Sequence, residues 1–306
     1  MLQKLFSTFL HKRTAFFISV LTGALWVCWP HVCMAQRSAQ KDMRSRVMER
    51  LEEEEAARLL AFFRAQRPAE NFCFQFQLLH KPRRGSTVRY KGFMYGSFNE
   101  QGPVTRFKLF PERVGNELPE GLSPIEMIVQ NGPSPEVWVR REDSAPFTLI
   151  QDDSLFEPIF EGVLYTPFDM QMPFIFWNRY LYEGPSRVLS RIGHNFLMFP
   201  PADSLAESNG LHAVRVAIDD TYYALLRAEV LQDDDQVRSR FTVRGIKKIQ
   251  DNYIVKEIEI KNMITKDATT FRVKAAYLGL EFADATFDPV DPAELPETAS
   301  IPFEVF

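Results

Sequence analysis

The clearest pattern in the chain is an alternation of apolar and polar residues along its last third. Five stretches of about ten residues show it, and short polar or acidic turns separate them. Alternating strands joined by short turns are typical of an antiparallel meander. We expect the acidic residues to serve the turns rather than catalysis or calcium binding. The predicted strands are LHAVRVAI (211–218), YYALLRAEVL (222–231), RSRFTVRGIKKI (238–249), YIVKEIEIKNMI (253–264) and TTFRVKAAYLGL (269–280).

The first part of the chain shows the same alternation. In FCFQFQLLH (72–80), large apolar residues alternate with Cys and Gln, which predicts a strand with one strongly apolar face. Gly, Pro and Asn residues separate this strand from the next ones. The further predicted strands are TVRYKGFMYGSF (87–98), VTRFKLF (104–110), IEMIVQ (125–130), EVWVRR (136–141) and RVLSRIGHNFLMF (187–199).

Two segments have helical character instead. Residues 41–66 contain no Gly or Pro, and their apolar residues recur near helical spacing, which predicts an amphipathic helix with an acidic solvated face. A helical insert is expected around residues 154–182. The fold class is therefore α+β, mainly β, with one large antiparallel sheet. Its apolar face must be covered, by closing, by sandwiching or by curling around helices. No linker divides residues 36–306, which we expect to form a single domain.

An unusual composition marks the helical insert. YTPFDMQMPFIFW (165–177), hereafter the aromatic segment, holds one charged residue among aromatic and methionine side chains. Thr166 is placed to cap a helix, Pro167 suits the first turn, and Asp169 suits the positive end of the helix dipole. Pro173 removes an internal hydrogen bond and should end or kink the helix. A short helix with a break fits either a movable lid or a fixed plug.

The N-terminal sequence has the features of a secretory signal peptide. Lys4, Lys12 and Arg13 precede an uncharged run (14–29), and the small residue Ala35 follows where a signal peptide could be cleaved. The run has 16 residues, fewer than the roughly 20 that span a membrane as a helix. We predict a cleaved signal peptide, residues 1–35, and a periplasmic mature protein, with a retained anchor as the alternative.

Composition narrows the classes of partner. The full chain has a net charge of −4, and residues 36–306 carry 33 basic against 40 acidic residues. That balance disfavours nucleic acid, whose binding requires neutralisation of phosphates. Cys73 is the one cysteine after residue 35, so neither an intrachain disulfide nor a thiolate metal cluster is expected there. It has no basic neighbour in sequence, so we expect an inert thiol.

No set of catalytic residues stands out. His80, His194 and His212 are isolated in sequence, and the chain has no nucleophile elbow, phosphate loop or dinucleotide fingerprint. We expect no enzyme activity, no cofactor and no metal. The chain does have 27 phenylalanines. They fill an ordinary core or line a cavity for acyl chains, whose burial gives roughly 0.8 kcal/mol per methylene.

The order of several short motifs resembles a known family. After a signal peptide and an amphipathic helix, the order of the motifs is similar to that of the outer-membrane lipoprotein-sorting carriers of the Lol type, the LolA-like family. The motifs are Gly92-Phe93-Met94-Tyr95, Arg106-Phe107-Lys108-Leu109-Phe110, Val129-Gln130-Asn131-Gly132 with Glu136-Val137-Trp138-Val139, Thr166-Pro167-Phe168-Asp169-Met170, and Gly184-Pro185-Ser186-Arg187-Val188-Leu189.

This resemblance implies a half-open antiparallel barrel, LolA/LolB-like, with helices across its mouth and an apolar cavity that shields acyl chains in the periplasm. It implies an acylated lipoprotein or lipid as cargo, and an inner-membrane exporter and outer-membrane acceptor as partners. The family's lid is held by an arginine that contacts lid backbone, for which Arg106 is the candidate and Arg89 the alternative. The residues expected at the cavity or lid are Phe93, Tyr95, Phe107, Leu109, Trp138, Phe168, Met170, Met172 and Phe174.

Two functions of different class stay open on this fold. One is a carrier that ferries acyl chains toward the outer membrane, and the other is an envelope sensor that binds a protein and transfers no lipid. Relative to the compact carriers of this family, residues 111–124 and 200–210 look like added loops. A longer member of this kind could carry another lipid or bind one as a sensor, so the cargo stays open. A hydrolase, the third alternative, requires His194 or His212 beside a nucleophile.

Overall fold

The computed structural model describes residues 48–306 apart from residues 69, 113–122, 143–144, 161 and 233–235, and the backbone of two short strands before them. These strands, β1 (Ala15–Ile18) and β2 (Leu25–Cys28), pair antiparallel. The rest of the predicted signal peptide, its cleavage point and the domain boundary at residue 36 lie outside the described residues. Within the described ranges, no helix has the length and hydropathy needed to cross a membrane.

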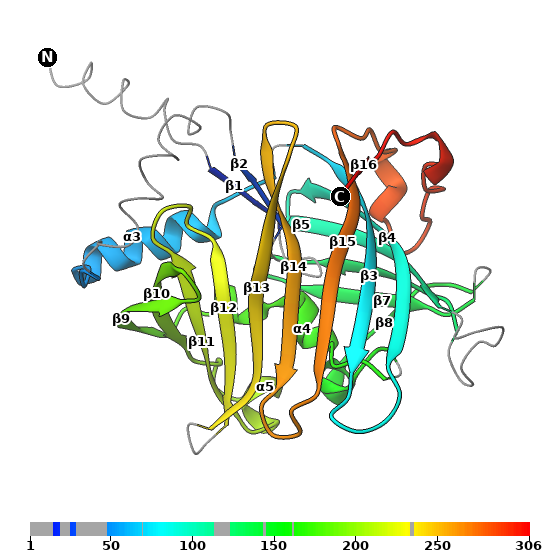
Figure 1. Cartoon of the computed structure of the whole chain (residues 1–306). Coiled ribbons are helices and arrows are strands. Elements are labelled where there is room, and N and C mark those ends of the chain that lie inside the picture. The colour runs from blue at the N-terminus through cyan, green and yellow to red at the C-terminus, as the bar shows by residue number, and fades with distance from the viewer. Residues whose placement is uncertain are drawn as a thin grey trace, which may run out of the picture.

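One curved, unclosed antiparallel sheet dominates the fold (Figure 1). Its strand order is β8-β7-β6-β5-β4-β3-β15-β14-β13-β12-β11-β10-β9, and β16 pairs with β15. The first meander comprises β3 (Phe72–Lys81), β4 (Val88–Asn99), β5 (Gly102–Pro111), β6 (Ile125–Gln130), β7 (Glu136–Arg140) and β8 (Thr148–Leu149). The second comprises β9 (Tyr180–Val188), β10 (Arg191–Met198), β11 (Leu211–Asp219), β12 (Leu225–Gln232), β13 (Val237–Ile249), β14 (Asn252–Asn262) and β15 (Ala268–Leu278).

The two meanders join where β3 pairs with β15. The predicted sheet and its class, mainly β with few helices, are confirmed. Hairpin turns lie at the expected polar positions, as between Ile249 and Asn252. The helical elements are α3 (Glu53–Arg64), α4 (Pro167–Gln171) and α5 (Leu205–Ser208), with short 3-10 turns η2 (Asp152–Phe156), η3 (Pro173–Phe176), η4 (Asp284–Phe287) and η5 (Thr298–Ser300).

The concave face of the sheet carries the core. Because side chains alternate between the two faces of a strand, rows of apolar residues run across paired strands. One such row passes from Phe74 through Met94 and Phe107 to Met127 on four neighbouring strands, all fully buried. Helix α3 packs Leu60 and other apolar residues against the same core. The sheet thus covers its apolar face by curling around helices.

The convex face is polar over the second meander. Ion pairs link strands there, since Arg215 pairs with Glu229 on the next strand and with Glu183 two strands away, and Arg240 also pairs with Glu229. The Arg215–Glu183 pair is partly exposed and contributes little stability, whereas Glu229 is buried between its arginines. These charged side chains explain why this face needs no cover.

Over β3–β5 the convex face is covered by the C-terminal segment, residues 279–306. The segment runs through η4 and η5 to β16 (Glu304–Val305), and its apolar side chains pack on Tyr95 and Cys73. Cys73 is fully buried there, and burial raises the pKa of its thiol. The thiol therefore has the inert environment expected of it.

The prediction of a single strand over 187–199 is wrong. Strand β9 ends at Val188 and β10 begins at Arg191, and between them Leu189 turns the chain with a φ of 54°. The helical insert also ends earlier than expected, because β9 already begins at Tyr180. Gly184 and Pro185 interrupt the alternation in β9, which conceals a strand from sequence analysis.

Helix α3 begins later than the predicted start at residue 41. Of that range, residues 41–47 lie outside the described residues and residues 48–52 are not helical. Glu52 caps the helix, and its backbone N–H donates to the Glu55 carboxylate at 3.3 Å. Before it, Arg50 donates to the carbonyl oxygens of Glu183 at 2.8 Å and Tyr182 at 3.2 Å. The chain therefore runs along edge strand β9 before it turns into the helix.

Candidate functional site

The aromatic segment (165–177) lies on the concave side of the sheet as two short helices (Figure 1). At the start of α4, the Thr166 hydroxyl accepts from the Asp169 N–H at 3.1 Å, and the Asp169 carboxylate accepts from the Thr166 N–H at 3.1 Å. Helix α4 ends at Gln171, and η3 begins at Pro173. The predicted cap, first-turn proline and break are confirmed.

The break is centred on Met172. Its φ of 47° and ψ of 50° lie in the left-handed region, which costs a residue with a side chain of order 1–3 kcal/mol. The Met172 side chain is buried in the core. Surrounding contacts therefore hold this kink in place, and the aromatic segment has a built-in corner.

An arginine from α3 holds one end of the aromatic segment. Arg64 Nε donates to the carbonyl oxygen of Ile175 at 2.6 Å, and its Nη2 donates to that of Trp177 at 2.6 Å. The guanidinium also lies over the ring of Tyr180 at 6.0 Å. Burial lowers the pKa of Arg64. Charge-assisted bonds of this kind are stronger than neutral ones, so Arg64 is a latch on the backbone of η3.

An asparagine holds the middle of the segment, at the end of α4. Asn131 Nδ2 donates to the carbonyl oxygens of Met170 at 2.9 Å and Gln171 at 2.8 Å. These carbonyls belong to the last turn of α4, where no further helical N–H is available to them. Asn131 stands at the turn after β6, and the following Gly132 has a φ of 126°, which glycine adopts without steric cost. The turn therefore presents the Asn131 amide to the end of α4.

Six of the predicted cavity residues come together in the core. Phe168 and Phe174 lie near each other, with ring centroids 5.9 Å apart, and Phe174 also contacts Trp177. The six are Phe107, Leu109, Phe168, Met170, Met172 and Phe174, all buried. In this structure the aromatic segment fills the concave face, and the sheet and the segment cover each other's apolar side chains.

Three predicted cavity residues lie on the convex face instead, which corrects the sequence-based expectation. Phe93 and Tyr95 flank Met94 on β4 and pack against the C-terminal segment. Trp138 lies between Val137 and Val139, both of which face the core. Since side chains alternate along a strand, a residue next to a core residue points to the opposite face. The motif resemblance identified the strands but not their faces.

The expectation that Arg106 holds the aromatic segment is wrong. Its guanidinium Nη1 donates to the carbonyl oxygens of Thr286 at 2.9 Å and Ala293 at 2.6 Å, both in the C-terminal segment. The alternative, Arg89, is exposed on β4. The residue that contacts the backbone of the aromatic segment in this way is Arg64.

Arg106 belongs to a buried charge cluster on the convex face. Glu126 accepts from Arg106 Nε at 2.6 Å and from Arg140 Nη2 at 2.6 Å, and its side chain is only 4% exposed. Burial lowers the pKa of Arg106, and the Glu126 carboxylate opposes that effect. This cluster fastens the C-terminal segment to the sheet.

Hollows lie on both sides of the aromatic segment. Beneath it, a slot of about 160 Å³ and a small hollow of about 10 Å³ share four lining residues and so form one path along β12–β14. The shared residues are Asp169, Val230, Ser239 and Ile260. On the other side lies a groove of about 410 Å³, lined by Phe156, Phe168 and Trp177 among others. Phe168, stacked on Phe156 with centroids 5.0 Å apart, lines both the groove and the slot.

Asp169 sits at the slot with a perturbed carboxyl group. Burial raises its pKa, and the bonds from Thr166 oppose this. Because its folded-state pKa exceeds the unfolded value of about 3.9, this group lowers stability as the pH rises from there through the folded-state pKa. Asp169→Asn, which keeps an acceptor for Thr166, should therefore be at least as stable as the unaltered protein at pH 7. Urea unfolding should show the difference between them shrinking toward acid pH. The prediction would be contradicted if Asp169→Asn destabilised the protein at pH 7, and did so more strongly there than at acid pH.

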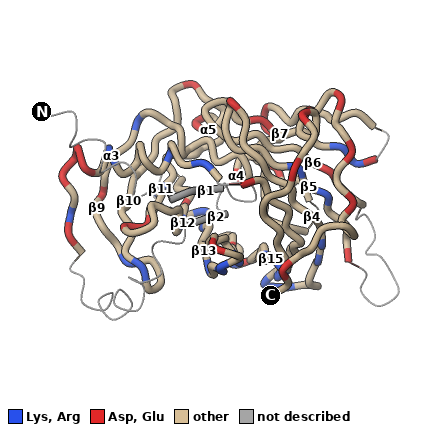
Figure 2. The backbone as a smooth tube through the Cα atoms, turned by 90° about the horizontal axis from the view of Figure 1, so that it is seen from above, with Lys and Arg blue, Asp and Glu red and all other residues tan. Residues whose placement is uncertain are grey.

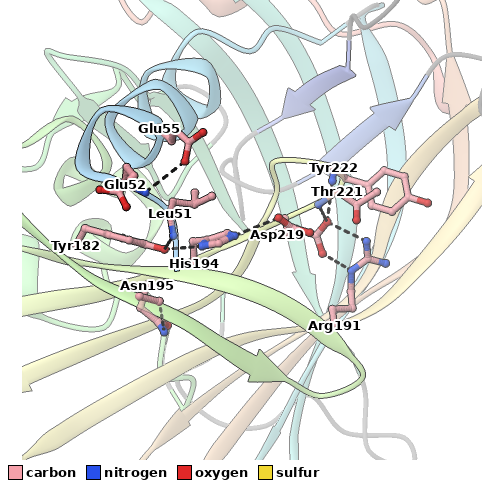
Figure 3. Close-up of polar contacts among 12 residues, drawn as sticks. Leu51, Glu52, Glu55, Tyr182, Arg191, His194, Asn195, Asp219, Thr221 and Tyr222 are labelled. Carbon is pink, nitrogen blue, oxygen red and sulfur yellow. Dashed lines mark hydrogen bonds and ion pairs between the residues drawn. The ribbon is translucent and has the colours of Figure 1, made fainter. Parts of the chain in front are cut away.

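A polar relay involving His194 lies between α3 and the second meander (Figure 3). The Leu51 N–H donates to the Tyr182 hydroxyl at 3.2 Å, and His194 Nδ1 bonds that hydroxyl at 2.7 Å. His194 Nε2 bonds the Asp220 carboxylate at 3.1 Å. Burial is the largest cause of a raised pKa at Tyr182, so the phenol stays protonated at neutral pH. The relay anchors the chain ahead of α3. His80 is likewise bonded to a hydroxyl, that of Thr269, which also accepts from the Leu164 N–H.

Two residues of the site, Arg64 and Asn131, were not identified from the sequence. Arg64 lies at the end of an amphipathic helix, and no local sequence feature distinguishes it from the other arginines of that helix. Asn131 belongs to the motif Val129-Gln130-Asn131-Gly132. An Asn-Gly pair beside a strand indicates a turn, but it does not indicate which group the asparagine side chain will bond.

No protein-family model matches the chain, and no curated protein is similar to it in sequence. Solved structures are similar in fold. A DUF1329 family protein from Desulfovibrio piger has a TM-score of 0.62 at 12% identity, over 77% of this chain and 96% of that one. An outer membrane lipoprotein-sorting protein domain from Vibrio parahaemolyticus has 0.61 at 11%, over 76% and 95%. A LolA superfamily protein from Nitrosomonas europaea has 0.53 at 10%, over 78% and 97%.

At these identities the likeness concerns the fold. The protein has a LolA-like fold: a curved, unclosed antiparallel sheet with few helices, most of them on its concave face. The expected fold resemblance is thereby confirmed.

Proposed function

We propose that the protein binds acyl chains of lipoproteins or lipids on the concave face of its sheet, with the aromatic segment as a movable lid. The observation that carries this proposal is how that segment is held. Side-chain donors from Arg64 and Asn131 bond its backbone carbonyls, and it pairs with no strand of the sheet within the described residues. Such bonds can break without disturbing the sheet. Departure of the segment would expose an apolar surface made by β3–β7 and β10–β15.

The slot under the aromatic segment supports the same proposal. Its inner part is lined mostly by apolar side chains of β12–β14 and by Met172 and Phe174, with Asp169 and Ser239 as the polar members. Methionine and phenylalanine adapt to an apolar guest, methionine by its flexible thioether. In the closed form the slot is small, so an acyl chain would have to displace these two side chains. The binding step and the opening step are therefore the same event.

Phe174→Asp tests this proposal. A charge in the slot should weaken the binding of a fluorescent fatty acid by at least about tenfold, since an unpaired buried carboxylate is strongly disfavoured. Phe174→Leu should retain most of the affinity. The readouts are titration fluorescence and circular dichroism, and native mass spectrometry of the purified protein should show co-purified lipid.

Phe303→Asp is the matched control, because Phe303 packs on Phe93 on the convex face. It places the same charge in an apolar cluster away from the slot and should leave the affinity unchanged. The proposal would be overturned if the unaltered protein bound no fatty acid, or if Phe174→Asp bound it with the same affinity as the unaltered protein.

The proposal also includes a periplasmic location and a carrier role. A periplasmic carrier would receive cargo from an inner-membrane exporter, give it to an outer-membrane acceptor and perform no catalysis. The similarity in fold to a lipoprotein-sorting domain supports this role. The alternative is an envelope sensor on the same fold. Transfer of labelled lipid from the protein to acceptor vesicles distinguishes the two, since a sensor would bind a protein partner and transfer none.

A further inference from the structure

The groove of about 410 Å³ lies outside the aromatic segment and has no role in the binding step proposed above. Its walls come from η2, the β7–β8 region, α5 and the aromatic segment. Most lining residues are apolar, including Leu155, Phe156, Pro173 and Trp177. Leu205 of α5 also lines it and is 41% exposed. An open apolar groove of this kind favours a partner that buries it.

The charges of the groove have one sign. Its lining contains two charged residues, Glu136 and Asp152, and both are acidic. Asp153 on η2 and Glu207 on α5 add exposed carboxylates beside it. Figure 2 shows acidic residues along the side of the molecule where α5 and β7 lie, whereas acidic and basic residues are mixed near β13 on the opposite side. A surface of this sign repels anionic lipid headgroups and attracts cationic groups.

The walls of the groove also connect it to the aromatic segment. Phe168 and Trp177 line the groove and pack with Phe174 in the core. The Asn209 amide donates to the Asp153 carboxylate at 3.1 Å, which joins α5 to η2 across the end of the groove. The groove is therefore a formed feature of the closed state, with the aromatic segment as one of its walls.

We propose that this groove binds a basic, apolar peptide segment of a partner protein. The apolar side chains of the peptide would bury Leu155, Phe156 and Leu205, and its lysines or arginines would meet Glu136 and Asp152. Apolar contact supplies most of the affinity in such a groove, and the rim charges select the sign of the partner. This inference does not rest on the proposed lipid binding, because it is argued from the groove of the closed state alone.

The test uses two labelled synthetic peptides, one of leucine and lysine at helical spacing and one with glutamate in place of each lysine. The lysine peptide should bind the full chain at least about tenfold more tightly at low salt, and added salt should reduce the difference. Glu136→Lys with Asp152→Lys should reverse or abolish the preference. Glu136→Gln with Asp152→Asn is the conservative pair, since Asn tolerates the left-handed φ of 55° at residue 152. It should give an intermediate loss.

Asp291→Lys with Glu294→Lys is the matched control. It makes the same change in net charge on exposed residues of the C-terminal segment, on the convex face. This control should keep most of the preference for the lysine peptide. Equal binding of both peptides, or equal losses in the groove pair and the control pair, would overturn the proposal. Loss of fatty-acid binding alone would leave it intact, because the two readouts are separate.

Discussion

Glu126→Gln is expected to lower the free energy of unfolding by about 3–5 kcal/mol, the cost of leaving buried charges without their partner. Arg106 and Arg140 both donate to this carboxylate at 2.6 Å or slightly more, and Arg106 is buried with it. The uncompensated guanidinium groups would also weaken the hold on the C-terminal segment. Urea unfolding measures the first effect. The reactivity of Cys73 toward a thiol reagent measures the second, since this thiol becomes accessible when the segment detaches.

Glu257→Gln is the control for this result. Glu257 also lies on the convex face and pairs with Arg272, at side-chain exposures of 28% and 42%. A pair so exposed is worth about 0–1 kcal/mol. A loss for Glu126→Gln no larger than for Glu257→Gln would show that burial of the cluster is energetically unimportant, contrary to its geometry.

The double variant Arg64→Met with Asn131→Ala is expected to release the aromatic segment. Each change removes two side-chain donors to backbone carbonyls and should cost about 1–3 kcal/mol. Arg64 bonds carbonyls at the C-terminal end of the segment and Asn131 bonds carbonyls at its middle, so the two changes remove separate bonds and should sum to roughly 2–6 kcal/mol for opening. Amide hydrogen exchange across residues 166–177 should accelerate by at least about 30-fold, as about 2 kcal/mol implies.

The same variant distinguishes a lid from a plug. A lid should open while the sheet stays folded, so that exchange accelerates in the aromatic segment alone and fatty-acid uptake becomes faster. A plug should take the core with it, so that exchange in β12–β14 accelerates equally. Gln66→Ala is the control on the same helix end, because Gln66 donates to Tyr223 O, outside the segment, at 3.4 Å. Arg64→Lys should be intermediate, since an ammonium lacks the planar fork that reaches both carbonyls.

The sequence carried more information about the sheet than about the site. Period-two alternation is a local property, so most strands of both meanders could be predicted, and the local capping residues predicted the start of α4. Strand β9 was missed because Gly184 and Pro185 break its alternation. Phe93, Tyr95 and Trp138 were placed on the wrong face because motif likeness was preferred to the parity of neighbouring core residues.

The contacts of the latches depend on tertiary structure. Arg64 and Ile175 are 111 residues apart in sequence, and Arg106 and Thr286 are 180 apart. No local periodicity predicts which of many arginines reaches a particular carbonyl. The C-terminal segment has short 3-10 turns and almost no strand, so its cover over β3–β5 has no sequence signature.

The pairing of β3 with β15 also determines when the fold can be completed. It joins Lys81 to Ala268 and Phe72 to Leu278, positions 187 and 206 residues apart. Every other pairing among β3–β15 links consecutive strands and can form early. Contacts between distant residues form slowly because loop closure must precede them. Until β15 has emerged, two separate meanders each expose an apolar face, and the nascent chain depends during that interval on protection from aggregation.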